Sequence, residues 1–149
     1  MYPMMVDISK RKVVVVGGGK IATRKLQELI RCGAKPTIIA PDVSPEIQDW
    51  AESGKAVLVR RAYQSGDLAG ATFIFICTDD PATNNAIRSE IGPHQFLNDT
   101  TDRSNSDFIN LATLRQDDYL VAVSTFGNDP RKAKQILYEI AEKINPTQA

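Results

Sequence analysis

A run of four valines that leads directly into three glycines is the feature that most constrains the fold. These residues open the segment VVVVGGGKIATRK at residues 13–25. A short, uninterrupted apolar run before glycine is typical of a strand that is covered on both faces, as in a parallel sheet. Apolar residues at helical spacing follow and stop before Gly33, and glycine is common just after a helix end. The segment therefore predicts a strand, a tight glycine turn and a helix.

Strands and helices are predicted to alternate up to residue 100. Further strands are expected at residues 37–40, 56–59, 72–77 and 96–98. Helices are expected from Ser44 to about Gly54 and from Asp80 to about Glu90, each with a proline directly after its capping residue. This rhythm predicts an α/β fold, with a Rossmann-like parallel sheet and right-handed crossovers.

The pattern changes after residue 100. A polar loop, DTTDRSNSD, leads to a predicted antiparallel hairpin of strands 108–114 and 119–125, and an amphipathic helix begins at Asp129-Pro130. We expect a Rossmann domain at 1–112 and a small hairpin-plus-helix domain at 113–149. So small a unit buries little apolar surface by itself. The expected cover is a second copy of the chain, which makes a homodimer; the alternative is that the segment folds back onto its own sheet.

The composition excludes several classes of function. Eighteen basic residues balance eighteen acidic ones, so charge gives no argument for nucleic-acid binding. No apolar run approaches the roughly 20 residues of a membrane helix, so no membrane partner is expected. Cys32 and Cys77 are interpreted as core thiols, which favours a cytoplasmic protein. Two cysteines and one histidine are too few for a structural zinc site, and no metal is expected.

The glycine run also carries a binding motif. Residues 17–22, GGGKIA, fit the pattern G-x-G-x-x-A of dinucleotide-binding loops. Gly17 allows the tight turn out of the strand, Gly19 lets the backbone approach a pyrophosphate, and Ala22 lets helix and strand pack closely. The helix N-terminus presents N–H groups to the phosphates. The order strand, loop, helix favours a nucleotide site over a purely structural turn.

Two further positions lie where such sheets bind a nucleotide. Asp42 follows the second strand, where an acid commonly binds the ribose hydroxyls, and no arginine follows immediately to accept a 2′-phosphate. This arrangement favours NAD over NADP, although Asp42 also fits a simple turn residue. Thr78 follows the fourth strand and can hydrogen-bond a cofactor. Asp80, two residues further on, is explained as a helix cap.

Several stretches, in order along the chain, resemble the precorrin-2 dehydrogenase family, which forms the N-terminal part of siroheme synthases. They are PMMVDISKRKVVVVGGGKIATRK, IIAPDVSPEI, ICTDDPATNNAI, FLND…DFINLA and LVAVSTFGNDPRKAKQI. The resemblance implies a Rossmann domain with a dimerisation domain, and NAD-dependent oxidation of precorrin-2 to sirohydrochlorin on the way to siroheme. The cofactor contacts that it implies are Gly17, Gly19, Lys20, Ile21, Pro41, Asp42 and Thr78.

The catalytic position departs from the family pattern. Similar family members usually carry an aspartate three residues after the asparagine that ends the fifth strand, and counting from Asn98 this position is Thr101. Threonine is no base at neutral pH without an activating partner. We expect the next residue, Asp102, to accept the proton. The alternatives are that the acid function is displaced or lost, or that the loop is only a solvated turn.

The implied substrate carries many carboxylates, so a basic cleft is expected. Ser124 lies where the family's pocket closes around the substrate, and Arg131 lies near a helix N-terminus, which favours anions. Backbone capping and a solvated helix face are the alternatives for these two residues. Many relatives also insert iron with a further helical domain. The chain ends at Ala149 and its one histidine, His94, is interpreted as a turn residue, so no efficient ferrochelatase activity is expected.

Two other functions remain open at this point. An NAD(H)-sensing regulatory module would share the glycine loop, but it would not explain the stretches TDDPATN and LVAVSTFGNDP. A catalytically impaired family member that only binds the tetrapyrrole is kept open by Thr101. A sensor would bind the cofactor without oxidising anything.

Overall fold

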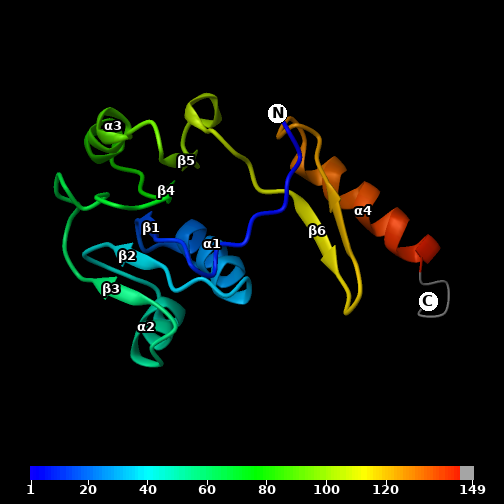
Figure 1. The fold of residues 1–149 in the computed structure, drawn as a ribbon, viewed down its shortest axis with the longest axis horizontal. Helices are drawn as coiled ribbons and strands as arrows, with labels where there is room; N and C mark the ends of the chain where they lie inside the picture. The colour runs from blue at the N-terminus through cyan, green and yellow to red at the C-terminus, as the bar shows by residue number, and fades with distance from the viewer. Residues whose placement is uncertain (145–149) are drawn as a thin grey trace. The chain divides into compact units, whose positions relative to one another are not determined.

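The computed structural model describes residues 1–144, which form two compact units. The first unit is Tyr2–Phe108, and the second begins at Ile109. Figure 1 shows the first unit in blue to green and the hairpin and last helix of the second in yellow to red. The predicted division between residues 112 and 113 stays a prediction, and its last positions, 145–149, lie outside the described residues.

The first unit is built on a five-stranded parallel sheet in the order β3-β2-β1-β4-β5. The strands are β1 Val13–Val16, β2 Thr37–Ile39, β3 Val57–Val59, β4 Phe73–Ile76 and β5 Phe96–Asp99. The helices are α1 Lys20–Arg31, α2 Pro45–Glu52 and α3 Pro81–Glu90, and the short 3-10 helix η1 spans Arg103–Asn105. The predicted α/β class with a Rossmann-like parallel sheet is confirmed.

The valine run is apolar throughout because β1 lies in the centre of this sheet. Val15 pairs with Ile38 of β2 on one side and with Phe75 of β4 on the other. Successive side chains of a strand point to opposite faces. Val13 and Val15 therefore join the core under α1 and α2, whereas Val14 and Val16 join the core under α3. A strand buried on both faces needs an apolar residue at every position.

Replacement of Leu26 on α1 by alanine is expected to lower the free energy of unfolding of this unit by about 3 kcal/mol, because a fully buried leucine leaves a cavity behind. The Leu26 side chain is 0% exposed and packs in the core under α1. Urea unfolding measures the change. The control is Gln27→Ala on the exposed face of the same helix, where a change within about 0.5 kcal/mol is expected. Equal effects of the two variants would contradict the packing described for α1.

The second unit is an antiparallel hairpin with one helix. Its elements are β6 Ala112–Arg115, β7 Leu120–Val123 and α4 Pro130–Ile144. The predicted hairpin-plus-helix arrangement is confirmed, but its first strand begins at Ala112, not at Phe108. Phe108 belongs to the first unit, where its ring stands edge-on against Phe73 and Phe75 at 5.6 and 5.4 Å between ring centroids.

The interpretation of both cysteines as core thiols is wrong for Cys32. Cys32 is the residue that ends α1, as its C-cap, and it is exposed. Cys77 is partly buried directly after β4, and burial raises the pKa of its thiol to about 11. Neither cysteine forms a disulfide in the described residues. No helix within residues 1–144 is long and apolar enough to cross a membrane.

Candidate functional site

Gly17 makes the turn out of β1. Its φ of 115° lies in the region that favours glycine, and its N–H donates to the Ile39 carbonyl at 3.0 Å. A Cβ atom at this position would collide with the carbonyl of Cys77, which follows β4. The fold itself therefore requires glycine here, whatever the loop binds.

Gly18 is a second packing glycine, at the position where the motif accepts any residue. A Cβ atom there would collide with the Asp42 carbonyl and with Val43. The Ser44 N–H donates to the Gly18 carbonyl at 3.0 Å. The loop after β1 is thus locked against the loop after β2. Gly18 was not among the site residues predicted from the sequence. The only signal for it was a glycine at a motif position that accepts any residue.

Gly19 differs from its two neighbours because no protein atom requires it. Its φ is −84°, which any residue adopts, and a Cβ atom built there meets nothing within 4 Å. It is the N-cap of α1, and no side chain caps this helix end. An open space beside uncapped helix N–H groups suits an anion such as a diphosphate. This space is where the residues present fit a dinucleotide.

The loops at the carboxyl edge of the sheet enclose a cavity of about 630 Å³. This edge is where open α/β sheets bind ligands, and the volume suits a cofactor. The structure brings together around this cavity all the cofactor-contact residues predicted from the sequence: Gly17, Gly19, Lys20, Ile21, Pro41, Asp42 and Thr78. Ala62 and Tyr63 after β3, and Thr100 and Thr101 after β5, also line it and were not among the predicted contacts.

The turn between β4 and α3 is fixed by side chains that bond its backbone. Asp80 caps α3 by accepting from the Thr83 N–H at 2.9 Å, and the Thr83 hydroxyl and N–H hold the pKa of this carboxyl below its ordinary value. The Asn84 amide donates to the Thr78 carbonyl at 3.1 Å from a nearly buried position. Asn84 was not among the site residues predicted from the sequence, in which nothing distinguishes it from the adjacent Asn85. These bonds hold Thr78 at the cavity wall.

The segment after β5 is organised by a buried carboxylate. Asp99 is 3% exposed, and one of its oxygens accepts from the Thr101 N–H at 2.8 Å and from the Thr101 hydroxyl at 2.7 Å. The other oxygen accepts from Arg88 Nε of α3 at 2.7 Å. Burial raises the pKa of Asp99, but the bonds from Thr101 and Arg88 outweigh it, so the net pKa lies below the ordinary value. Asp99 therefore stays ionised.

Asp102, the predicted proton acceptor, is not part of the cavity wall. It caps η1, where one carboxylate oxygen accepts from the Ser104 N–H at 3.0 Å and from the Ser104 hydroxyl at 2.7 Å. These two bonds hold the pKa of Asp102 below its ordinary value. The other oxygen has no partner among residues 1–144. The neighbour Thr101 does line the cavity, so Asp102 lies one residue beyond it.

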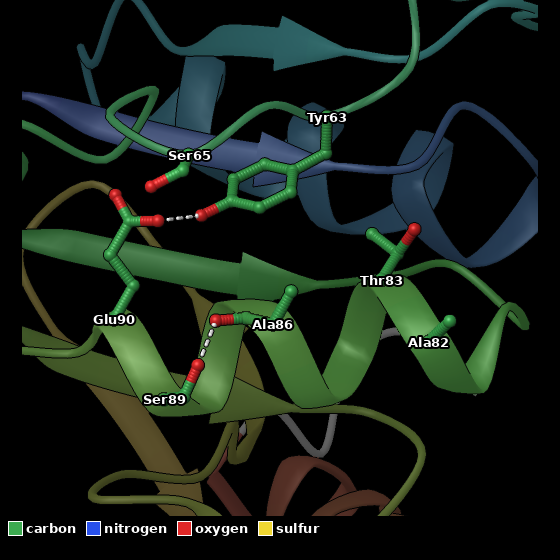
Figure 2. Close-up of a pocket in the computed structure, with 7 residues that line it drawn as sticks. All are labelled: Tyr63, Ser65, Ala82, Thr83, Ala86, Ser89 and Glu90. Atoms are coloured by element: carbon green, nitrogen blue, oxygen red, sulfur yellow. Dashed lines mark hydrogen bonds between the residues drawn. The ribbon is translucent and has the colours of Figure 1, made fainter.

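A second pocket, of about 570 Å³, shares Tyr63 and Thr83 with the cavity wall. Figure 2 shows the Tyr63 ring over α3, with its hydroxyl directed to the Glu90 carboxylate. Burial and the bond to Glu90 raise the pKa of this phenol, so the hydroxyl keeps its proton. Glu90 also accepts from the Gly66 N–H at 2.8 Å. The Tyr63–Glu90 bond thus fixes the orientation of a ring that borders both pockets.

The two predicted substrate contacts, Ser124 and Arg131, belong to the second unit. The Ser124 hydroxyl accepts from the Phe126 N–H at 3.0 Å. The Arg131 N–H donates to the Asp129 carboxylate at 3.0 Å, so Asp129 caps α4. Both predicted residues therefore take part in the turn that leads into this helix. Their role in substrate binding stays a prediction.

Comparison with known proteins gives consistent matches along nearly the whole chain. The family described as "Putative NAD(P)-binding" matches residues 4–112. The chain is 32% identical to the precorrin-2 dehydrogenase of Bacillus subtilis (strain 168), over 97% of this chain and 90% of that protein. It is 33% identical to the precorrin-2 dehydrogenase of Priestia megaterium, over 97% of this chain and 72% of that protein. It is also 32% identical to siroheme synthase 1 of Serratia proteamaculans (strain 568), of which it covers 30%.

A solved structure agrees with these relatives. It is described as SirC, precorrin-2 dehydrogenase, and it superposes on the present structure with a TM-score of 0.87. The two chains are 33% identical, and the match covers 96% of this chain and 71% of the other. The similarity therefore includes both the parallel sheet and the hairpin-plus-helix unit.

Proposed function

Because the chain belongs to the precorrin-2 dehydrogenase family, we propose that it is an NAD-dependent oxidoreductase that converts precorrin-2 to sirohydrochlorin in siroheme synthesis. The observation that carries this function is the cavity at the carboxyl edge of the sheet, with the open space at Gly19 beside the uncapped end of α1. The experiment is an anaerobic assay with purified protein, NAD⁺ and precorrin-2, in which NADH and the product spectrum are followed together.

The chain's own residues bind and orient the two reactants. The N–H groups at the start of α1 would hold the diphosphate, and Asp42, which lines the cavity, would accept hydrogen bonds from the ribose hydroxyls. Thr78 lies after β4, on the half of the sheet that takes the nicotinamide end. When bound, NAD⁺ supplies the hydride acceptor that no amino-acid side chain provides.

The substrate also loses a proton, for which we keep Asp102 as the acceptor. Its carboxylate is ionised at neutral pH, because the bonds from Ser104 lower its pKa. Only one of its oxygens is used in capping η1 within the described residues, so the other is available. The proposal is supported by Thr101, the residue before Asp102, which lines the cavity.

The protein is proposed to act as a homodimer through its second unit. In α4 only Ala133 and Leu137 are buried and Tyr138 is 65% exposed, and Phe126 in the turn before the helix is 68% exposed. A second copy is the natural cover for this apolar surface. Sedimentation equilibrium is expected to give twice the 16.4 kDa mass of the chain, and Tyr138→Glu is expected to shift the mass towards one chain. A single-chain mass for the unaltered protein at micromolar concentration would contradict this assembly.

The alternatives are distinguished by what the cofactor does. An NAD(H)-sensing module is not favoured, because the relatives that match nearly the whole chain are named precorrin-2 dehydrogenase or siroheme synthase. A catalytically impaired member would bind NAD⁺ and precorrin-2 without turnover. The cytoplasm is proposed as the place of action, supported by two cysteines that form no disulfide with each other. The expected lack of efficient ferrochelatase activity stays a prediction.

A further inference from the structure

An ion pair between a fully buried carboxylate and a partly buried arginine holds the segment after β5, which lines the cavity through Thr100 and Thr101. The Asp99 side chain is 0% exposed, and Arg88 Nη2 lies 2.6 Å from its second carboxylate oxygen. The first oxygen accepts from three donors of the next residues, including the Asp102 N–H at 3.1 Å. Arg88 Nη2 also donates to the Thr101 hydroxyl oxygen at 3.0 Å. Thr101 is therefore hydrogen-bonded to both members of the ion pair, and Asp102 is hydrogen-bonded to Asp99.

A pair of this kind is an unusual choice if its purpose is stability alone. Removing two charges from water costs about as much as their attraction returns, and apolar residues of similar volume often serve a core equally well. Apolar residues cannot, however, accept hydrogen bonds from backbone N–H groups. The Asp99 carboxylate bonds the N–H groups of Thr101 and Asp102, so it fixes the path of the chain at this edge.

The bonds also fix the orientation of the Thr101 hydroxyl. This hydroxyl has one proton, which it donates to Asp99 at 2.7 Å, and it accepts from Arg88 at 3.0 Å. It therefore has no proton left to donate to a ligand. A carboxylate in place of Thr101 would have no proton for Asp99 and would meet it as a like charge. The ionised Asp99 thus needs a hydrogen-bond donor at position 101, and Thr101 supplies one.

We propose that Arg88 and Asp99 are positioning residues for the dehydrogenation, acting through Thr101 and Asp102. They hold Thr101 in the cavity wall and the Asp102 carboxylate next to it. This inference rests on the proposed function, because it assigns a role in the same reaction. Neither residue lines the cavity, so each acts only through the segment that it holds.

Arg88→Met tests the proposal with three readouts: amide hydrogen exchange, cofactor affinity and kcat. We expect the exchange of the Thr101 and Asp102 amides to rise at least about tenfold, since both bonds depend on the position of Asp99. The Kd for NADH should stay within about threefold, because the glycine loop is untouched. The kcat with precorrin-2 should fall roughly 10- to 100-fold, the cost of a misplaced catalytic group. Arg88→Lys, which keeps the charge, should recover part of the loss.

The matched control is Arg61→Met, which removes another arginine–aspartate pair from the same unit. Arg61 bonds both oxygens of Asp67, at 2.7 Å each, and donates to the Ala62 carbonyl at 2.9 Å; none of these partners belongs to the segment after β5. This variant should leave the exchange of the Thr101 and Asp102 amides unchanged. Should Arg88→Met fail to fold, Thr101→Val replaces it, since valine keeps the volume and loses the hydroxyl. It should lower kcat, and Thr101→Ser should recover most of the loss.

Unchanged amide exchange in Arg88→Met would overturn the proposal, because the pair would not hold the segment. Fast exchange with a normal kcat would also overturn it, because the position of the segment would not matter for the reaction. Equal losses of kcat and NADH affinity would assign the pair to general folding and would overturn it too. An inactive unaltered protein would refute the proposed function instead, and the exchange readout would still show whether the pair holds the segment.

Discussion

Gly19→Val is expected to weaken binding of the dinucleotide strongly while the protein stays folded. The backbone at Gly19 is extended and a Cβ atom there meets no protein atom within 4 Å, so the fold accepts a side chain. The side chain would fill the space that the diphosphate needs beside the start of α1. We expect the Kd for NADH to rise at least about 100-fold, equal to about 2.7 kcal/mol. Fluorescence titration with NADH measures the affinity, and thermal unfolding measures the fold.

Gly17→Ala is the informative comparison for Gly19→Val. A Cβ atom at Gly17 would collide with the Cys77 carbonyl, and the φ of 115° strains any other residue. This variant should therefore lose stability as well as cofactor binding. Near-normal NADH affinity in Gly19→Val would contradict the placement of the diphosphate at this glycine, because the cofactor would then bind elsewhere.

Asp102→Asn is expected to lower kcat about 100-fold or more, the usual contribution of a positioned proton acceptor. Asparagine caps helices as well as aspartate does, so the bonds to Ser104 that start η1 should persist. NADH affinity and the unfolding temperature should stay close to those of the unaltered protein. Steady-state kinetics with precorrin-2 under anaerobic conditions measures the change.

The pH dependence of the unaltered protein gives a second test of Asp102. Bonds from Ser104 hold its pKa below the ordinary value of 3.8, so the ionised form persists on acidification. The rate should therefore not fall between neutral pH and pH 5 through protonation of this group. Thr101→Asp should not raise the rate, because the new carboxylate would meet Asp99. A full rate in Asp102→Asn, or a large gain in Thr101→Asp, would assign the proton to another group.

The parts of the fold predicted correctly from the sequence are those fixed by local patterns. The four valines before glycine predicted β1, and proline after a capping residue predicted the starts of α2 and α3. The expected cofactor contacts came from the glycine motif, from the residues after β2 and β4 and from the family resemblance; all of them line one cavity, and their contact with a cofactor stays a prediction. These features depend on residues close together in the chain, so a sequence pattern can report them.

The remaining features depend on contacts between distant residues. Phe108 was assigned to the hairpin because it follows a polar loop, but its ring packs on Phe73 and Phe75 of β4. Gly18 is required by the loop after β2, and Arg88 meets Asp99 only because α3 lies beside β5. No local pattern distinguishes a buried aspartate such as Asp99 from the turn aspartates around it. The Arg88–Asp99 pair was therefore visible only in three dimensions.

The most direct measurement of the central claim is the stoichiometry of the anaerobic reaction. Purified protein is mixed with enzymatically generated precorrin-2 and NAD⁺, and NADH absorbance is recorded together with the tetrapyrrole spectrum. The account predicts that one NADH appears for each sirohydrochlorin formed, at a rate far above that without protein, and that Gly19→Val loses both signals. Binding of NAD⁺ and precorrin-2 without formation of either product would contradict it, and the glycine loop would then belong to a sensor or a carrier.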